Sequence, residues 1–186
     1  MKKGVDALLD ENVRLRQELR RLRAELVRDE LTGLYNARHL RETLDERIRA
    51  CRREARSLSL VFLDLDRFKD INERYGHEAA GRILAQVGRV LTRAIRAEDS
   101  AFRYAGDEFV VLLEGSAERA RVIGERMRRL VETHEFIVDG ERRARVTASL
   151  GVRTLRDTDT AESLLVEADR AMFEAKRRSR NVLVAA

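Results

Sequence analysis

The 186-residue chain has no proline, no tryptophan, a single cysteine and no uninterrupted apolar stretch longer than five residues. The lone Cys51 cannot form an intramolecular disulfide, which is typical of a reducing compartment, so we expect a cytoplasmic protein. Such short apolar stretches exclude a membrane-spanning helix. The N-terminus has lysines with no apolar segment behind them, so the sequence predicts no secretory signal.

Lysine is also scarce: there are 34 arginines against 4 lysines, 33 acidic residues and a net charge of +5. A basic balance suggests an anionic partner, such as nucleic acid, a membrane surface or nucleotide phosphates. Because acidic residues are interspersed among the arginines, we expect most arginines to be solvated or locally paired. The hydrophobic content of 44% is too high for disorder. The length suits one core with a short appendage.

The appendage, residues 1–28, carries a heptad repeat over residues 5–27. Its a and d positions hold Val5, Leu8, Asn12, Leu15, Leu19, Leu22 and Leu26. An asparagine at an a position selects the register and favours a parallel pair. Opposite charges at g and e would face each other across the seam: Glu11 with Arg16, and Glu18 with Arg23. We therefore expect a parallel homodimeric coiled coil; the alternative is an amphipathic helix packed on its own domain.

Residues 29–186 alternate between helical and strand patterns and are expected to form one domain. Strand patterns cover 58–66, 100–114, 142–152 and a short C-terminal segment. Helical patterns cover 40–55, a short segment at 67–76, a longer one at 77–96, and then 116–133 and 160–178. Turns are expected at 105–107 and at Asp139-Gly140. Cys51 lies on an apolar helical stripe, so we expect it in the core. The pattern predicts an α/β (α+β) fold with helices flanking a mixed, mostly antiparallel central sheet.

Carboxylates stand at the end of the first strand. Asp64 and Asp66 end an otherwise apolar run, where burial is costly unless a cation compensates. Asp107 and Glu108, at a turn, would add a second cluster if the two strands are neighbours. Carboxylates with no histidine or cysteine nearby suit Mg²⁺ or Mn²⁺ rather than zinc.

A helix begins directly after these acids, at Arg67-Phe68-Lys69. Free amides at a helix N-terminus beside such a metal site bind phosphate. The structural alternative is that Asp66 caps this helix and Asp64 forms a salt bridge.

Five segments, in order, resemble the signature segments of GGDEF domains, the diguanylate cyclases. They are DELTGLYNARHL (29–40), LDLDRFKDINERYGH (63–77), RYAGDEF (103–109), TASLGV (147–152) and ADRAMFEAKRRSRN (168–181). The resemblance implies a nucleotide-cyclase, ferredoxin-like domain. It also implies that two such domains, each with one GTP, face each other and form cyclic di-GMP with release of pyrophosphate.

The resemblance implies a role for each matching residue. For the metal, these are Asp64, the Leu65 carbonyl and Asp107. The catalytic residues are Asp107, which helps to activate the attacking hydroxyl, and its neighbour Glu108. The triphosphate is bound by the amides of Phe68 and Lys69 and by the side chains of Lys176 and Arg180. Asn72 binds the guanine edge.

Two positions depart from the family pattern. Ala105 replaces the first glycine of the signature and is the smallest possible intrusion there. Gly81 stands where the family has an aspartate that accepts hydrogen bonds from guanine. A site without that carboxylate no longer rejects adenine on that edge. Gly81 is compatible with weaker GTP binding, with relaxed base choice that includes cyclic GMP-AMP synthesis, or with rescue by water.

An RxxD segment, Arg96 to Asp99, lies five residues before the signature, as in the family's product-inhibitory site. The arginines at 126, 128 and 129 are candidates for a second arginine of that site. The alternative is a surface pair. These residues leave a second function open, that of a non-catalytic cyclic di-GMP receptor. Nucleic-acid binding through the N-terminal helix is disfavoured, because its g positions are acidic.

Overall fold

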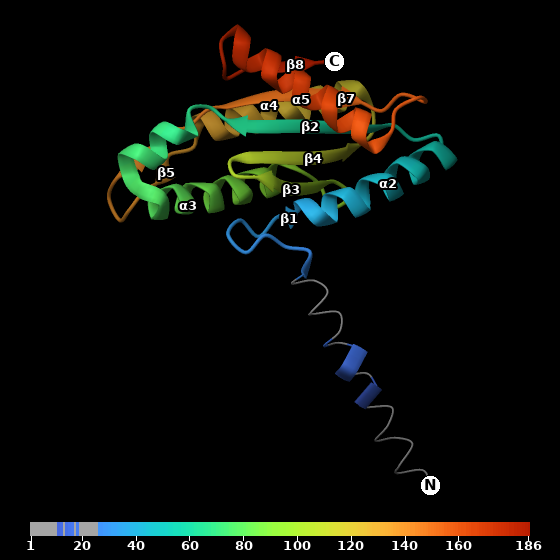
Figure 1. Ribbon diagram of the computed structural model, residues 1–186, viewed down its shortest axis with the longest axis horizontal. Helices are drawn as coiled ribbons and strands as arrows, with labels where there is room; N and C mark the ends of the chain where they lie inside the picture. The colour runs from blue at the N-terminus through green and yellow to red at the C-terminus, as the bar shows by residue number, and fades with distance from the viewer. Residues whose placement is uncertain (1–10, 13, 17, 19–25) are drawn as a thin grey trace.

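The computed structural model describes residues 11–12, 14–16, 18 and 26–186 (Figure 1). In chain order its elements are β1 (Tyr35–Asn36), α2 (Ala37–Arg53), β2 (Leu58–Leu65), α3 (Phe68–Ala94), β3 (Ser100–Ala105), β4 (Glu108–Glu114), α4 (Ala117–Thr133), β5 (Phe136–Ile137), β6 (Arg143–Ala144), β7 (Ala148–Thr154), α5 (Ala161–Arg178) and β8 (Leu183–Ala185). Most of the predicted coiled coil lies outside the described residues.

The central sheet has six strands in the order β1-β3-β4-β2-β7-β8. The three inner pairings are antiparallel, and the two edge strands, β1 and β8, each pair in parallel. The predicted mixed, mostly antiparallel sheet flanked by helices is therefore confirmed. None of the described helices is long and apolar enough to cross a membrane.

Alternation along β2 divides the core into two layers. Leu60 and Phe62 pack with α2 and α5 on one face of the sheet, whereas Val61 and Leu63 pack with α3 and α4 on the other. Both faces of β2 are buried, which explains its nearly continuous apolar sequence. Figure 1 shows α5 in front of the sheet and α4 behind it. Cys51 lies on the buried face of α2 and is fully buried, as expected.

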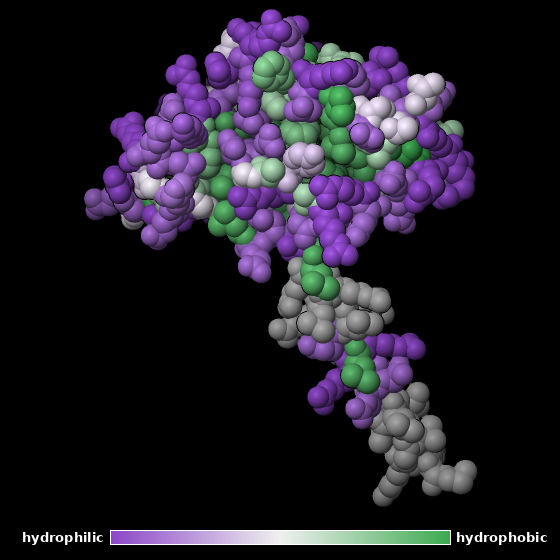
Figure 2. All heavy atoms as spheres, in the orientation of Figure 1, coloured by the Kyte–Doolittle hydropathy of each residue, from purple (hydrophilic) through white to green (hydrophobic). Residues whose placement is uncertain are grey.

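Most of the arginine-rich surface is hydrophilic on the face shown in Figure 2, where apolar side chains emerge only in small areas. Several arginines form an ion pair with an acidic residue one helical turn away, as Arg38 does with Glu42. This arrangement agrees with the expectation that most arginines are solvated or locally paired.

Helix α3 begins differently from the other long helices. The side chains of Asn36, Ser116 and Thr160 cap α2, α4 and α5. At α3 the capping position is Arg67, which has a left-handed backbone with φ of 53° and whose side chain forms no capping hydrogen bond. The prediction that Asp66 caps this helix is therefore wrong, and the first amides of α3 have no side-chain acceptor.

Two expected elements differ in detail. The segment 142–152 is not one strand: β6 pairs with β5 in a separate hairpin, and β7 joins the central sheet. The hairpin tip at Asp139-Gly140 is in the predicted place. Helix α3 is kinked at Gly76, where φ is 79°, which explains why the sequence indicated a short and then a longer helix.

Candidate functional site

Asp64 and Lys176 form an ion pair at the end of β2. The register of the sheet places Asp64 beside Glu108 of β4 and Ser149 of β7. Lys176, in the last turn of α5, puts its Nζ 2.7 Å from Asp64 Oδ2. The Asp64 side chain is only 8% exposed and that of Lys176 is 27% exposed. The predicted alternative of a salt bridge at Asp64 is therefore present, and its partner is one of the predicted phosphate-binding residues.

Negative charge is concentrated around this pair. Burial raises the pKa of Asp64, and the nearby Asp107 and Asp66 raise it further, while Lys176 opposes the shift. Burial also raises the pKa of Glu108, with additional contributions from Asp64 and from Asp169 of α5. The carboxylates therefore lie close enough to disfavour each other's charge, which is typical of a cation-binding site.

The turn at 105–107 is attached to β2 and to the N-terminal segment. Leu65 N donates to Asp107 O over 3.3 Å. Arg103 donates from Nε and Nη2 to Gly106 O, at 3.0 and 2.9 Å, and its Nη1 lies 3.1 Å from Asp29 Oδ2. The sequence included both Asp29 and Arg103 in signature segments, but nothing in the pattern indicated their pairing. Ala105 is exposed, so its methyl group is accommodated.

Asp66 has a structural position. Its carboxylate accepts hydrogen bonds from the hydroxyls of Thr147 and Ser149, both at 2.7 Å, and from the amide of Asn181 at 3.0 Å. These contacts tie together the end of β2, the start of β7 and the turn after α5. Asp64 and Asp66 therefore have different surroundings, although the sequence grouped them.

A hollow of about 310 Å³ lies beside the carboxylates, between the first turns of α3 and the turn at 105–107. Phe68, Asn72, Gly81 and Asp107 contribute to its lining. Asn72 Oδ1 lies 3.2 Å from Nδ1 of His77, a contact that orients the Asn72 amide. The structure thus brings the predicted guanine-binding residue Asn72 and the substituted position Gly81 into one hollow.

The oxygen ligands suit a metal ion that is shared with a nucleotide. Among the described residues, no three acidic, histidine or cysteine side chains are arranged to hold a metal ion alone. Mg²⁺ usually binds through one or two carboxylates and completes its shell with phosphates and water. Asp64, Asp107 and the Leu65 carbonyl could supply such a partial set. The residues therefore fit Mg²⁺ or Mn²⁺.

The predicted phosphate-binding residues lie around this end of the sheet. Phe68 and Lys69 form the uncapped first turn of α3, and the Lys69 side chain is exposed. Arg180, directly after α5, lines a second hollow that also contains Arg67. The residues predicted to bind the triphosphate thus lie at the start of α3, near the end of α5 and directly after it, and their phosphate binding stays a prediction.

Arg96 and Asp99 line a separate hollow of about 320 Å³ together with Arg28. The Asp99 carboxylate, 1% exposed, is paired with Arg119, whose Nη2 lies 2.7 Å from Oδ2. Burial alone would raise the pKa of Asp99, but the bonds from Arg119 and from the Arg96 amide hold it below its usual value. Asp99 is therefore engaged structurally, and the sequence did not indicate Arg119 as its partner.

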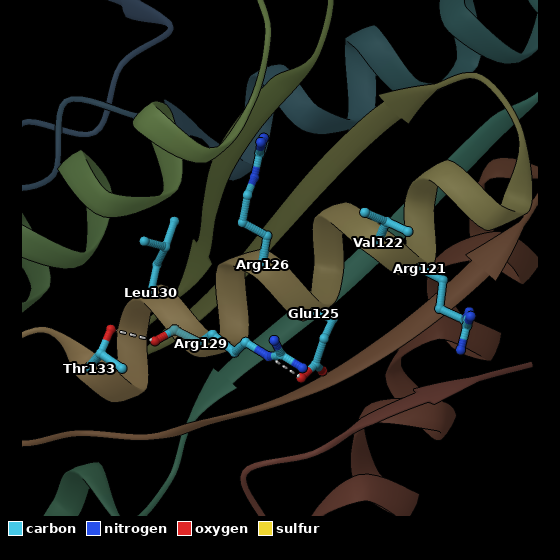
Figure 3. A pocket seen from close by; sticks show the side chains of 7 residues that line it. All are labelled: Arg121, Val122, Glu125, Arg126, Arg129, Leu130 and Thr133. Carbon is cyan, nitrogen blue, oxygen red and sulfur yellow. Dashed lines mark hydrogen bonds and ion pairs between the residues drawn. The ribbon is translucent and has the colours of Figure 1, made fainter.

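The three candidate second arginines on α4 have different partners, and Figure 3 shows two of them, Arg126 and Arg129. Arg126 donates to the carbonyl oxygen of Ala94, at the end of α3 and close to Arg96. Arg129 pairs with Glu125, as Figure 3 shows. Arg128 pairs with Glu125 and Glu132. Of the three, only Arg126 reaches toward the predicted product site.

Comparisons with known proteins find relatives of this chain. The family model "Diguanylate cyclase, GGDEF domain" matches residues 26–182. Diguanylate cyclase DgcS of Shewanella oneidensis is 38% identical over 82% of this chain and 50% of its own length. Response regulator PleD of Caulobacter vibrioides is 37% identical over 85% of this chain and 36% of its own length. The chain thus spans half or less of these relatives.

Solved structures show the same fold. The coiled coil and GGDEF domain of DgcB from Caulobacter crescentus, in complex with c-di-GMP, superposes with a TM-score of 0.89 at 25% identity, covering 100% of this chain and 98% of that one. Diguanylate cyclase SiaD from Pseudomonas aeruginosa, in complex with its activator SiaC, gives 0.84 at 33% identity, covering 99% and 72%.

Proposed function

The chain belongs to the GGDEF family of diguanylate cyclase domains, and from this premise we propose that it condenses two GTP molecules to cyclic di-GMP with the help of Mg²⁺ or Mn²⁺. The observation that carries the proposal is the Asp64–Lys176 pair, with Nζ and Oδ2 2.7 Å apart and Glu108 on the adjacent strand. A buried carboxylate and a cation that can move to a phosphate are what a metal-assisted phosphoryl transfer requires.

Each side chain in the proposal has a defined task. The amides of Phe68 and Lys69 hold the triphosphate, because α3 lacks a side-chain cap. Lys176 exchanges Asp64 for a phosphate oxygen when nucleotide binds. Asp107 accepts the proton of the attacking 3′-hydroxyl. Asp64, Asp107 and the Leu65 carbonyl would hold the metal, which would neutralise charge at the phosphates.

The proposed reaction needs two copies, because each domain offers one such site. The N-terminal heptad supplies a means of pairing. Leu15 and Leu26, at d and a positions, are 60% and 74% exposed in the single chain. Leucines at such positions are buried in a coiled coil. We propose that residues 5–27 form a parallel homodimer that brings the two domains together.

Product control is proposed at Arg96 and Asp99. The hollow they share with Arg28 is open, and the Arg96 side chain forms no ion pair in the described part of the chain. Because Arg119 holds the Asp99 carboxylate, Arg96 is the residue most available to a phosphate or a guanine edge.

Gly81 favours a second candidate function, a domain that binds cyclic di-GMP without making it. The hollow beside Asn72 lacks a carboxylate at this position, so recognition of guanine there is weakened. A third possibility is an enzyme of relaxed base choice that makes cyclic GMP-AMP from GTP and ATP.

One experiment separates these candidates. The full chain is incubated with GTP, with ATP and with both, in the presence of Mg²⁺, and the products are identified by mass spectrometry. Cyclic di-GMP from GTP supports the proposal, and cyclic GMP-AMP from the mixture supports the relaxed enzyme. No cyclic dinucleotide, together with cyclic di-GMP binding that Arg96→Ala abolishes in calorimetry, would support the receptor instead.

A further inference from the structure

A hollow of about 410 Å³ opens on the other side of the α3 N-terminus; we refer to it as the tail pocket. Three chain segments meet there: the start of α3, the loop before β7 and the turn after α5. Each contributes an arginine to the lining, namely Arg67, Arg145 and Arg180. The Asp66 carboxylate fastens these segments to one another through its hydrogen bonds with Thr147 and Asn181.

Positive charge exceeds negative charge in the lining of the tail pocket. In the described part of the chain, the side chains of Arg67 and Arg180 form no ion pair. Arg145 lies 3.6 Å from Glu135, with both side chains mostly exposed, and such a contact is weak. The lining also contains Asp70 and Asp66, and the hydrogen-bond donors of Asp66 are neutral, so three guanidinium groups lie with two carboxylates. Three guanidinium groups in one hollow suit a ligand with several negative charges.

Backbone strain is concentrated at the same place. Four described non-glycine residues have a positive φ, and three of them line the tail pocket: Arg67 at 53°, Arg180 at 56° and Asn181 at 50°. Such conformations cost energy and persist where the surroundings enforce them, often at functional sites. Asn181 is held by Asp66, Glu132 and Arg128. These hydrogen bonds hold the strained turn and so fix the backbone position from which the neighbouring Arg180 side chain extends.

The first turn of α3 separates the tail pocket from the hollow beside Asn72. Phe68 and Asn72 line the latter, while Asp70 and Ile71 line the tail pocket. At 3.6 residues per turn, these two pairs lie on different sides of the helix. A nucleotide with its base beside Asn72 and its phosphates over the α3 amides would extend its terminal phosphates toward the tail pocket.

We propose that Arg67 and Arg145, together with Arg180, bind the terminal phosphates of the substrate and hold pyrophosphate after transfer. This inference rests on the proposed function and extends it to Arg67 and Arg145, which lie outside the residues assigned above. In the transfer, the 3′-oxygen bonds to the α-phosphorus and the bond to the bridging oxygen breaks. The pyrophosphate leaves with that electron pair, and the hydroxyl proton passes through Asp107 to solvent. The charge of the leaving group thus grows where these arginines converge.

The test is calorimetric titration of the full chain with inorganic pyrophosphate. Arg145→Ala and Arg67→Gly are compared with Arg143→Ala, which removes one positive charge from the same loop region at a residue outside the tail pocket. We expect each of the first two changes to weaken pyrophosphate binding about tenfold and Arg143→Ala to change it less than about twofold. Equal affinity of the wild type and Arg145→Ala would overturn the inference.

Two further readouts separate this inference from misfolding and from the proposed function. Arg67→Gly relieves a positive φ, so its melting temperature should not fall while its pyrophosphate affinity does. GMP, which lacks the terminal phosphates, should bind Arg145→Ala and the wild type equally; a matching loss of GMP affinity would contradict the assignment. If pyrophosphate binding depends on Arg145 but no cyclic dinucleotide forms, the proposed function fails and the anion site stands.

Discussion

Lys176 Nζ lies 2.7 Å from Asp64 Oδ2, so the lysine that is predicted to bind phosphate neutralises the carboxylate that is predicted to bind the metal. Lys176→Met should therefore raise the pKa of Asp64 further and remove a phosphate ligand. We expect the rate of cyclic dinucleotide formation to fall about 10²-fold or more, as for the loss of other charge-stabilising groups. Initial-rate assays with GTP measure this effect.

Arg177→Met is the matched control, because it removes one positive charge from the neighbouring exposed residue of α5. Its rate should stay within about twofold of the wild type, since an exposed charge is screened. Equal losses in both variants would show that net charge, rather than the position of Lys176, matters.

Gly81→Asp should restore discrimination between bases. A Cβ at Gly81 would meet only Leu31 Cδ1, at 3.6 Å, which is an ordinary contact, so the helix can accept the side chain. The new carboxylate would accept hydrogen bonds from guanine and repel the adenine edge. We expect the preference for GTP over ATP to increase at least about tenfold, measured as the ratio of kcat/KM values.

Gly81→Ala is the control for this change. Alanine should stabilise α3 by about 0.5–1 kcal/mol, because glycine is a poor helix former. It carries no acceptor, so the preference between GTP and ATP should stay as in the wild type. A shift of preference in Gly81→Ala would show that volume, and not hydrogen bonding, sets base choice here.

The guanidinium group of Arg103 should position the turn at 105–107. Arg103→Lys keeps the charge but cannot bond Gly106 O with two nitrogens while also pairing with Asp29. We expect activity to fall about tenfold with a small change in melting temperature. In a double-mutant cycle with Asp29→Asn, the two effects should be non-additive. Strictly additive effects of the two substitutions would show that Asp29 does not act on the turn through Arg103.

The buried Asp99–Arg119 pair gives a pH-dependent contribution to stability. Because the pKa of Asp99 is held below its usual 3.8, the stabilisation is present above that pH and is lost as the pH falls through the folded-state value. Asp99→Asn should lower the free energy of unfolding by about 1–3 kcal/mol at pH 7. In urea titrations the difference from the wild type should shrink below about pH 4.

Asp139→Asn provides the contrast, because the Asp139–Arg142 pair lies on the exposed hairpin. An exposed pair contributes little, so the change at pH 7 should be below about 1 kcal/mol. A cost equal to that of Asp99→Asn would show that burial of Asp99 is not the cause.

The N-terminal heptad predicts a dimer that depends on its exposed leucines. Leu15→Glu places a charge in the seam, whereas Arg14→Glu changes a position outside it. In analytical ultracentrifugation, Leu15→Glu should shift the chain to monomer and Arg14→Glu should not. Asn12→Leu should stabilise the pair and blur its register. A uniquely dimeric Leu15→Glu chain would contradict the coiled coil.

Local sequence patterns predicted much of the fold. The apolar run of β2 and the helical periodicity of α4 and α5 reflect which residues within each element are buried, so the sequence alone predicts these elements. The short strand β1 was not predicted, because its two residues are held by pairing with β3, a contact distant in sequence. The break between β6 and β7 depends likewise on two different partners.

Some residues of the candidate site could likewise be predicted from the sequence, and others could not. Asp64 was identified by its place at the end of an apolar strand and Lys176 by resemblance to a family segment, and the structure places them in contact. The separate position of Asp66 could not be predicted, because it depends on hydroxyls from β7 and on an amide after α5. Arg119 gave no signal, since its pairing with Asp99 arises only when α4 packs beside the start of β3.

The most direct test of the account is the product formed from GTP and Mg²⁺ by the dimeric wild-type chain, with Asp64→Asn as the inactive reference. The account predicts cyclic di-GMP with two pyrophosphates released per product molecule, and no product from Asp64→Asn. Absence of any cyclic dinucleotide from the wild type under dimeric conditions, or equal yields from both chains, would contradict it.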